Sequence, residues 1–276
     1  MTAQPTLTLN TGRAMPQFGL GVWQTPADDA ASVVATALAA GYRAVDTAAA
    51  YRNESGVGEG LKAAGVDRAE LFITTKLWND DQGYDSALHA FDRSLSKLGL
   101  ETLDLYLIHW LSPHRDKYVD SWKALVRLQA DGRVGAIGVS NFAPEHLERI
   151  IGETGITPAV NQVELHPRFQ QRPLREAHDR LGITTQSWSP LGQGKLLEDP
   201  TIARVAAKHG KTPAQTIIRW HLDSGLIVIP KSVSPSRIRD NIAVFDFQLD
   251  ADDLATIGGL DDPHGRIGPD PLTAAF

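Results

Sequence analysis

Short runs of apolar and β-branched residues alternate along the chain with longer amphipathic stretches, and this alternation constrains the fold more than any other feature. Eight runs are candidate strands, at residues 18–22, 44–48, 71–76, 103–109, 134–140, 159–164, 183–189 and 226–231. Most are apolar almost throughout, which is typical of parallel strands covered on both faces. The stretches between them, such as residues 28–40, 84–99 and 121–132, have the spacing of amphipathic helices.

Eight strand-and-helix units in succession predict an α/β fold, a single (β/α)₈ TIM barrel that occupies residues 1–276 as one domain. Apolar runs at residues 6–10 and 15–19 predict a short N-terminal β-hairpin before the barrel. Four glycines follow helical patterns and are expected to end helices: Gly41, Gly99, Gly132 and Gly182. An open doubly wound sheet is the alternative, but the G-x-G-x-x-G sequence of such folds does not occur in the chain.

Composition excludes several classes of function. The formal net charge of −6 gives no reason to expect a nucleic-acid partner. The chain has no cysteine, which rules out disulfides and thiolate metal sites. The first residues lack the basic and apolar segments of a signal peptide, and no apolar run approaches the ~20 residues of a membrane span. We therefore expect a cytoplasmic protein that binds no membrane.

Three successive candidate strands end on an ionisable side chain: Asp46, Lys76 and His109 lie at the carboxyl ends of the second, third and fourth runs. Tyr51 follows Asp46 in the next loop. Because the strand ends of a (β/α)₈ barrel meet at one mouth, these side chains are expected to converge. Taken singly, each has an ordinary alternative. Asp46 could cap a turn, His109 could be a satisfied core histidine, and the other two could face solvent.

Together the four side chains predict general acid catalysis by a phenol. A tyrosine with a pKa near 10 is a poor proton donor at neutral pH. We expect Asp46 to hold Lys76 charged and the ammonium to lower the pKa of Tyr51. His109 would orient the oxygen of the substrate. Such a set suits protonation of an oxygen that develops negative charge, as in hydride transfer to a carbonyl.

Polar side chains also follow the later strands and predict a nucleotide cofactor site. The amides of Asn141 and Gln162 match the carboxamide of a nicotinamide ring, and Trp188 offers an aromatic face for stacking. Loop hydrogen bonding is the alternative for both amides. After the last strand, Lys231, Ser232 and Arg237 surround a predicted helix start and resemble a phosphate site, although Arg237 could also be a solvated surface charge.

Seven motifs stand in order along nearly the whole chain: GYRAVDTAAAYRNE, ITTKLWN, LDLYLIHW, VGAIGVSNF, AVNQVELHP, WSPLGQG and IPKSV. With these motifs the chain resembles the aldo-keto reductase superfamily, and within it the bacterial 2,5-diketo-D-gluconate reductase-like branch. The resemblance implies a catalytic tetrad at Asp46, Tyr51, Lys76 and His109, with Tyr51 as the acid. It also implies a substrate pocket walled by Trp23, Trp78 and Trp110.

The same resemblance implies NADPH, bound in an extended form without a Rossmann fold. The expected cofactor-binding residues are Gly21, Val22, Trp23, Ser140, Asn141, Gln162, Trp188, Ser189, Leu191, Gln193, Gly194, Lys231, Ser232, Val233, Arg237 and Asn241. Among them, Lys231, Ser232 and Arg237 would meet the 2′-phosphate, and Asn241 would lie near the adenine. The C-terminal residues 265–276 belong to a region where family members differ, so the resemblance says little about them.

The activity implied is NADPH-dependent reduction of aldehydes and ketones, including α-dicarbonyls and keto sugars, by a monomeric oxidoreductase whose partner is a small carbonyl substrate. Two alternatives remain. One is a non-catalytic, NADPH-sensing protein on the same barrel. The other is a metal-dependent barrel hydrolase, which the nine histidines do not favour because they form no H-x-H or H-E-x-x-H pair. We therefore expect no metal site.

Overall fold

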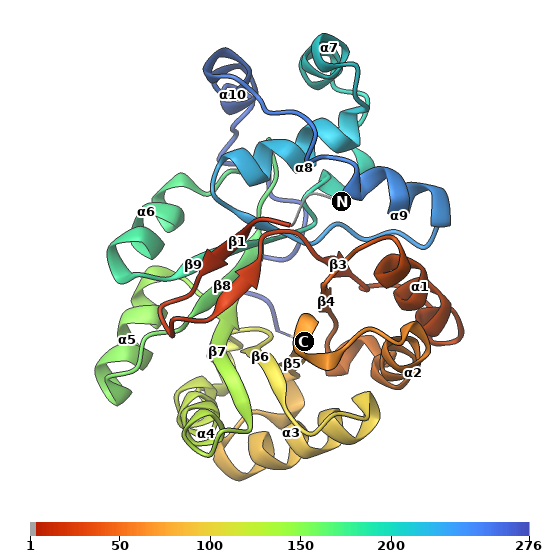
Figure 1. Ribbon diagram of the computed structural model, residues 1–276. Helices are drawn as coiled ribbons and strands as arrows, with labels where there is room; N and C mark the ends of the chain where they lie inside the picture. The colour runs from red at the N-terminus through yellow and green to blue at the C-terminus, as the bar shows by residue number, and fades with distance from the viewer. Residues whose placement is uncertain (1–3, 276) are drawn as a thin grey trace.

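The computed structural model describes residues 4–275 and confirms a (β/α)₈ barrel, which Figure 1 views along its axis. The barrel strands are β3 (Leu20–Gly21), β4 (Ala44–Asp46), β5 (Phe72–Leu77), β6 (Leu103–Ile108), β7 (Val134–Ser140), β8 (Val160–Glu164), β9 (Thr184–Trp188) and β10 (Ile227–Val228). Neighbouring strands pair in parallel in this order. Parallel bridges from Phe18 to Val228 and from Gly21 to Lys231 join the two edges and close the barrel.

Helices surround the sheet, so that each strand is buried between the barrel interior and a helix. The ring consists of α1 (Ala27–Ala39), α2 (Glu54–Ala64), α3 (Tyr84–Leu98), α4 (Tyr118–Ala130), α5 (Pro144–Thr154), α6 (Arg172–Leu181), α8 (Pro213–Asp223) and α9 (Pro235–Ile242). Two more helices, α7 (Pro200–His209) and α10 (Ala251–Gly258), lie outside α8 at the top of Figure 1. Gly99 and Gly182 end α3 and α6 in left-handed conformations, as expected of C-caps.

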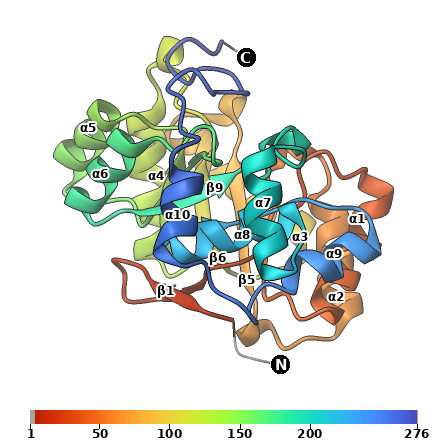
Figure 2. The same cartoon turned by 90° about the horizontal axis from the view of Figure 1, so that it is seen from above.

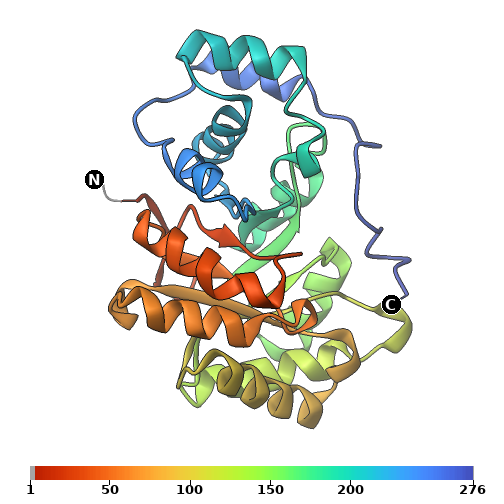
Figure 3. The same ribbon diagram turned by 90° about the vertical axis from the view of Figure 1, so that its right-hand side faces the viewer.

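The predicted N-terminal hairpin is present as β1 (Thr6–Thr8) and β2 (Ala14–Pro16). Leu9 and Met15 of the hairpin are buried against the interior residues Phe72 and Leu105 of the barrel strands. The hairpin therefore covers the N-terminal end of the barrel. Figures 2 and 3 show the C-terminal segment at the opposite end of the barrel.

The first and last barrel strands are shorter than predicted, with only two residues each in regular strand pairing. At this junction the backbones approach closely. A Cβ on Gly21 would lie 2.7 Å from the carbonyl oxygen of Ile229, which explains the glycine. Pro230 interrupts the last strand because it has no N–H to donate, although its carbonyl accepts from Gly21 N at 3.2 Å. No helix within residues 4–275 is both long and apolar enough to span a membrane.

Candidate active site

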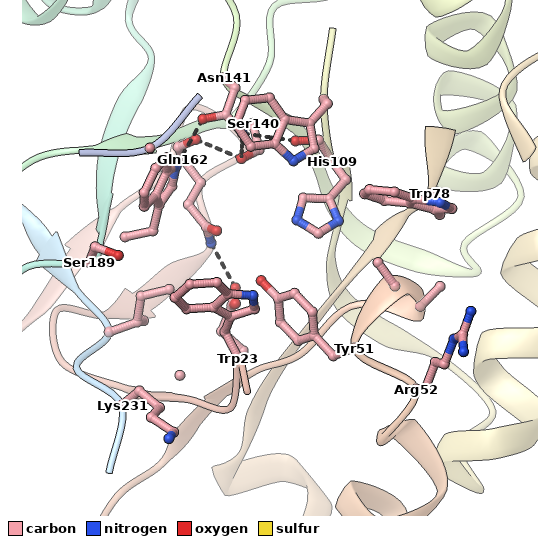
Figure 4. Close-up of a pocket in the computed structure, with 18 of the residues that line it drawn as sticks. Trp23, Tyr51, Arg52, Trp78, His109, Ser140, Asn141, Gln162, Ser189 and Lys231 are labelled. Carbon is pink, nitrogen blue, oxygen red and sulfur yellow. Dashed lines mark hydrogen bonds between the residues drawn. The ribbon is translucent and has the colours of Figure 1, made fainter. Parts of the chain in front are cut away.

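A cavity of about 660 Å³ opens at the carboxyl ends of the barrel strands. All four residues predicted to catalyse lie around it or beneath its floor. Asp46, Tyr51 and His109 line the cavity, and Lys76 lies below them with no exposed surface. Figure 4 shows Tyr51 and His109 directed into the same space from two different strand-end loops. The predicted convergence of these side chains is confirmed, because the parallel strands that carry them end at the same mouth of the barrel.

Lys76 and Asp46 form a buried ion pair on adjacent strands. The ammonium of Lys76 donates to Asp46 Oδ1 and to the carbonyl oxygen of Thr47 at 2.8 Å. Burial alone would lower the pKa of Lys76, but the Asp46 carboxylate outweighs it and holds the lysine charged. The capping role that Asp46 could have had is not what the structure shows, since its oxygens serve Lys76 and Gln162.

Tyr51 ends a short 3₁₀ turn, Ala49–Tyr51, that follows β4. Its ring centroid lies 5.1 Å from Lys76 Nζ. Burial raises the pKa of Tyr51 above that of an ordinary phenol, and the charge of Lys76 offsets only part of the rise. Lys76 thus lowers the pKa of Tyr51 as predicted, but the prediction that the net pKa falls below that of a free tyrosine was wrong. At neutral pH the Tyr51 hydroxyl keeps its proton, as a general acid must.

His109 follows β6 and faces Tyr51 edge-on, with ring centroids 5.5 Å apart. Burial, and then the nearby Lys76 charge, hold the pKa of His109 well below its ordinary value. The imidazole is therefore neutral at physiological pH and can donate one hydrogen bond to a substrate oxygen. Its Nδ1 atom is buried without a hydrogen-bond partner among residues 4–275.

The residues predicted to hold nicotinamide form one hydrogen-bonded cluster across the cavity from Tyr51 (Figure 4). Asn141 adopts a left-handed backbone conformation with φ of 63°. Its amide donates to the carbonyl oxygen of His109 at 3.0 Å and to Ser140 Oγ at 3.0 Å. The indole N–H of Trp188 donates to Asn141 Oδ1 at 2.9 Å, which fixes the tryptophan at the cavity wall. Loop hydrogen bonding and a cofactor role are thus compatible for Asn141.

Gln162 connects this cluster to the ion pair, a link that the sequence did not suggest. Its Nε2 atom donates to Asp46 Oδ2 at 2.7 Å and to Gln186 Oε1 at 2.8 Å. Gln186 is a polar residue in the middle of β9 and is 1% exposed. Its neighbours Thr185 and Ser187 in β9 are polar as well, so no local signal in the sequence distinguished it.

Nine of the expected cofactor residues line the cavity: Gly21, Trp23, Ser140, Asn141, Gln162, Trp188, Ser189, Gln193 and Lys231. The others lie outside its lining: Val22, Leu191, Gly194, Ser232, Val233, Arg237 and Asn241. The side chain of Val22 is fully buried in the core. Lys231 and Arg237 are exposed near the start of α9 and form no ion pair with any of residues 4–275. These two cations and the helix N-terminus could together hold a phosphate.

The three tryptophans predicted to wall the substrate pocket all line the cavity. The ring of Trp78 lies edge-on to that of His109, with ring centroids 5.3 Å apart. The ring of Trp110 lies 6.4 Å from that of Trp188. Trp23 is 43% exposed and forms the rim. The structure adds Gly268 and Pro269 of the C-terminal segment to the lining, which the sequence did not reveal.

No group of three or more histidine, aspartate or glutamate side chains that could hold a metal ion occurs within the described residues 4–275. The arrangement as a whole is a neutral phenol supported by a buried ammonium, beside a neutral imidazole and under a largely aromatic wall. It can deliver a proton to an oxygen placed between Tyr51 and His109.

Comparison with known proteins gives concordant results. The family model of the aldo/keto reductase family matches residues 15–262. Over 272 residues the chain is 57% identical to an aldo-keto reductase of Mycolicibacterium smegmatis, covering 99% of this chain and 98% of that protein. It is 53% identical to the methylglyoxal reductase DkgA of Escherichia coli strain K12, covering 98% of each. The crystal structure of a Gox0644 mutant in complex with NADPH matches with a TM-score of 0.96 and 56% identity, covering 99% of this chain and 100% of that one.

Proposed function

The chain belongs to the aldo/keto reductase family, and from this premise we propose that it reduces small aldehydes and ketones to alcohols with NADPH, using Tyr51 as the general acid. The observation that carries the proposal is the buried Lys76–Asp46 pair placed under the Tyr51 ring, with neutral His109 opposite. A buried ion pair is costly unless it is well paired. Its position beneath the one phenol in the cavity supports a catalytic purpose.

The protein residues divide the work of protonating the carbonyl oxygen. The Tyr51 hydroxyl donates its proton to the oxygen as negative charge develops there. The Lys76 ammonium stabilises the phenolate that remains, and Asp46 keeps the ammonium charged and in place. The neutral His109 ring donates a hydrogen bond to the same oxygen and so orients the carbonyl.

The residues present fit an NADPH molecule. When bound, NADPH supplies the hydride for the carbonyl carbon. Ser140, Asn141 and Gln162 place amide and hydroxyl groups at the cavity wall, and Trp188 presents a ring there. The exposed cations Lys231 and Arg237 suit the 2′-phosphate that distinguishes NADPH from NADH. We propose these contacts together with the remaining expected residues near α9, namely Ser232, Val233 and Asn241.

We propose small carbonyl compounds, α-dicarbonyls among them, as the substrates. Its walls near His109 are the rings of Trp78 and Trp110, which offer apolar surface. The relatives named methylglyoxal reductase support an α-dicarbonyl as substrate. Apolar walls discriminate weakly, by about 1–3 kcal/mol per methylene, so activity on several carbonyls is expected.

We further propose that residues 1–276 form one domain that acts as a cytoplasmic monomer without a nucleic-acid partner. The net charge of −6 supports the last point. Several large apolar side chains are exposed in separate parts of the chain: Tyr84 begins α3, and Ile156 and Leu197 lie in two different loops. Light scattering coupled to size-exclusion chromatography measures the assembly state directly.

The test of the function compares Tyr51→Phe with a matched control, Tyr106→Phe. Both remove one phenolic hydroxyl, but Tyr106 is buried in β6, where its hydroxyl has no hydrogen-bond partner among the described residues. With NADPH and methylglyoxal, Tyr51→Phe should lower kcat by about 10²–10⁴-fold or more. Tyr106→Phe should keep nearly full turnover. A Tyr51→Phe enzyme as active as wild type would refute the assignment, and NADPH binding without turnover of any carbonyl would favour the sensing alternative.

A further inference from the structure

The C-terminal segment, defined here as residues 261–269, lies along the loop that joins β8 to α6 and reaches the cavity. The guanidinium of Arg266 lies 4.7 Å from the ring centroid of Phe169. Asp262 N donates to the carbonyl oxygen of Arg168 at 3.1 Å. At Gly265 the two backbones are so close that a Cβ would lie 2.0 Å from that same oxygen. The segment is thus built onto this loop rather than laid loosely over it.

The firmest attachment is a single carboxylate, that of Glu164 at the end of β8. Its Oε1 accepts the backbone N–H of Ile267 at 2.6 Å, and its Oε2 accepts that of Gly268 at 2.8 Å. His166 Nε2 lies 3.1 Å from Oε1. The Glu164 side chain has no exposed surface. Two backbone donors directed at one buried carboxylate make strong, charge-assisted hydrogen bonds.

Glu164 is ionised under ordinary conditions. Burial raises its pKa, but the hydrogen bonds from His166 and the two backbone N–H groups outweigh burial and leave the pKa below its usual value. The carboxylate forms no hydrogen bond to a residue proposed for the proton transfer, since its partners are His166 and the backbone of Ile267 and Gly268. It is a buried charge that the reaction itself does not use.

The segment held by Glu164 forms part of the cavity wall. Gly268 and Pro269 line the cavity beside Trp188. A Cβ on Gly268 would lie 2.6 Å from Trp188 Cη2 and 2.9 Å from Glu164 Oε2. The segment therefore packs against the tryptophan too closely to accommodate a side chain at position 268, and it forms one of the surfaces that bound the cavity.

We propose that Glu164 is a positioning residue that sets substrate selectivity by holding residues 267–269 against Trp188 as one wall of the cavity. The proposal rests on the reductase function proposed above, because selectivity is read from carbonyl turnover. Removing the charge should release the wall without touching Tyr51. Small substrates then lose contacts, whereas bulky ones gain room.

Glu164→Gln is the informative variant because it preserves the shape of the side chain. A glutamine has one acceptor oxygen, so its NH₂ group would face one of the two backbone N–H donors. Hydrogen–deuterium exchange at Ile267 and Gly268 should become about tenfold faster or more, since a hydrogen bond to a charged group is lost. The ratio of kcat/KM for methylglyoxal over phenylglyoxal should fall by about tenfold, a typical value for altered pocket contacts. The change should reside in KM, with kcat for methylglyoxal near that of wild type.

Asp261→Asn provides the matched control. Asp261 ties the same segment to the same loop, accepting from Gln170 N and Arg172 Nε at 2.8 Å each, but it does not line the cavity. The Asp261→Asn substitution should lower thermal stability without changing the ratio of kcat/KM for methylglyoxal over phenylglyoxal. Equal shifts of the ratio in both variants, or unchanged exchange and ratio in Glu164→Gln, would overturn the proposal. A wild-type chain that reduces no carbonyl would instead refute the reductase function, and the exchange measurement would still show whether Glu164 holds the segment.

Discussion

Removal of the buried ammonium offers the sharpest separation of stability from catalysis in this protein. In Lys76→Met, Asp46 keeps only its hydrogen bond from Gln162, and the Thr47 carbonyl loses its donor. Both partners of the pair are almost fully buried, with side chains 0% and 4% exposed. The carboxylate left behind borders the cavity but has almost no exposed surface, so water solvates it poorly.

The size of the effect follows from that burial. Breaking a buried ion pair by removing one partner costs about 3–5 kcal/mol, because an uncompensated charge remains. At ~2–4 °C per kcal/mol for a chain of this size class, the melting temperature should fall by about 6–20 °C. The double variant Asp46→Asn/Lys76→Met removes both charges of this pair, so it should recover most of this loss. Its turnover should stay low, because nothing then stabilises the Tyr51 phenolate.

Thermal and urea unfolding of the wild type, the two single variants and the double variant form a cycle that measures the coupling directly. NADPH oxidation with methylglyoxal is followed in parallel on the same four proteins. If the double variant were as unstable as the sum of the single ones, the pair would contribute no coupling and the ion-pair reasoning would be refuted. Recovery of turnover in the double variant would refute the role of Lys76 in supporting Tyr51.

Three further outcomes are expected. Arg237→Ala should weaken NADPH binding by about 10–100-fold, the usual effect of losing a hydrogen bond to a charged group, and should leave NADH binding unchanged. Fluorescence titration of the variant with each coenzyme measures both affinities. Burial raises the pKa of Tyr51, so carbonyl reduction should hold through neutral pH and fall only above about pH 10, as a pH–rate profile will show. Burial lowers the pKa of His178 to about 4. As the pH falls, this histidine is protonated in the unfolded chain before it is protonated in the folded one. The free energy of unfolding should therefore decrease between about pH 6.5 and pH 4, by up to ~1.4 kcal/mol per pH unit. Urea unfolding of His178→Gln should show a smaller decrease over the same range, because the titrating group is gone.

The barrel and the convergence of Asp46, Tyr51, Lys76 and His109 could be predicted because they leave strong local signals. Parallel strands buried on both faces read as apolar runs, and their carboxyl ends meet at one mouth. Asp46, Lys76 and His109 each interrupt such a run at its end, so their convergence follows from topology alone. The predicted pKa of Tyr51 was less successful, because the sequence shows the neighbouring charge but not the degree of burial that opposes it.

The wall formed by the C-terminal segment could not be predicted, because it depends on contacts between residues about a hundred positions apart. Glu164 accepts from Ile267 and Gly268, and neither partner carries a side-chain signal, since the donors are backbone N–H groups. A glutamate at a strand end has the same appearance whether it is solvated or bonded. Gln186 was missed because it lies between the polar residues Thr185 and Ser187, and the sequence does not show that it bonds to Gln162.

Strand β8 connects the chemistry to the substrate wall. Its register with β9 places Gln162 beside Gln186 and Glu164 beside Trp188. Because side chains two residues apart on a strand point to the same face, Gln162 and Glu164 share one side of the sheet. The first supports Asp46 from that side and the second holds the C-terminal segment. A one-residue slip of β8 would turn both side chains away together, so its register determines both the hydrogen bond to Asp46 and the attachment of the C-terminal segment.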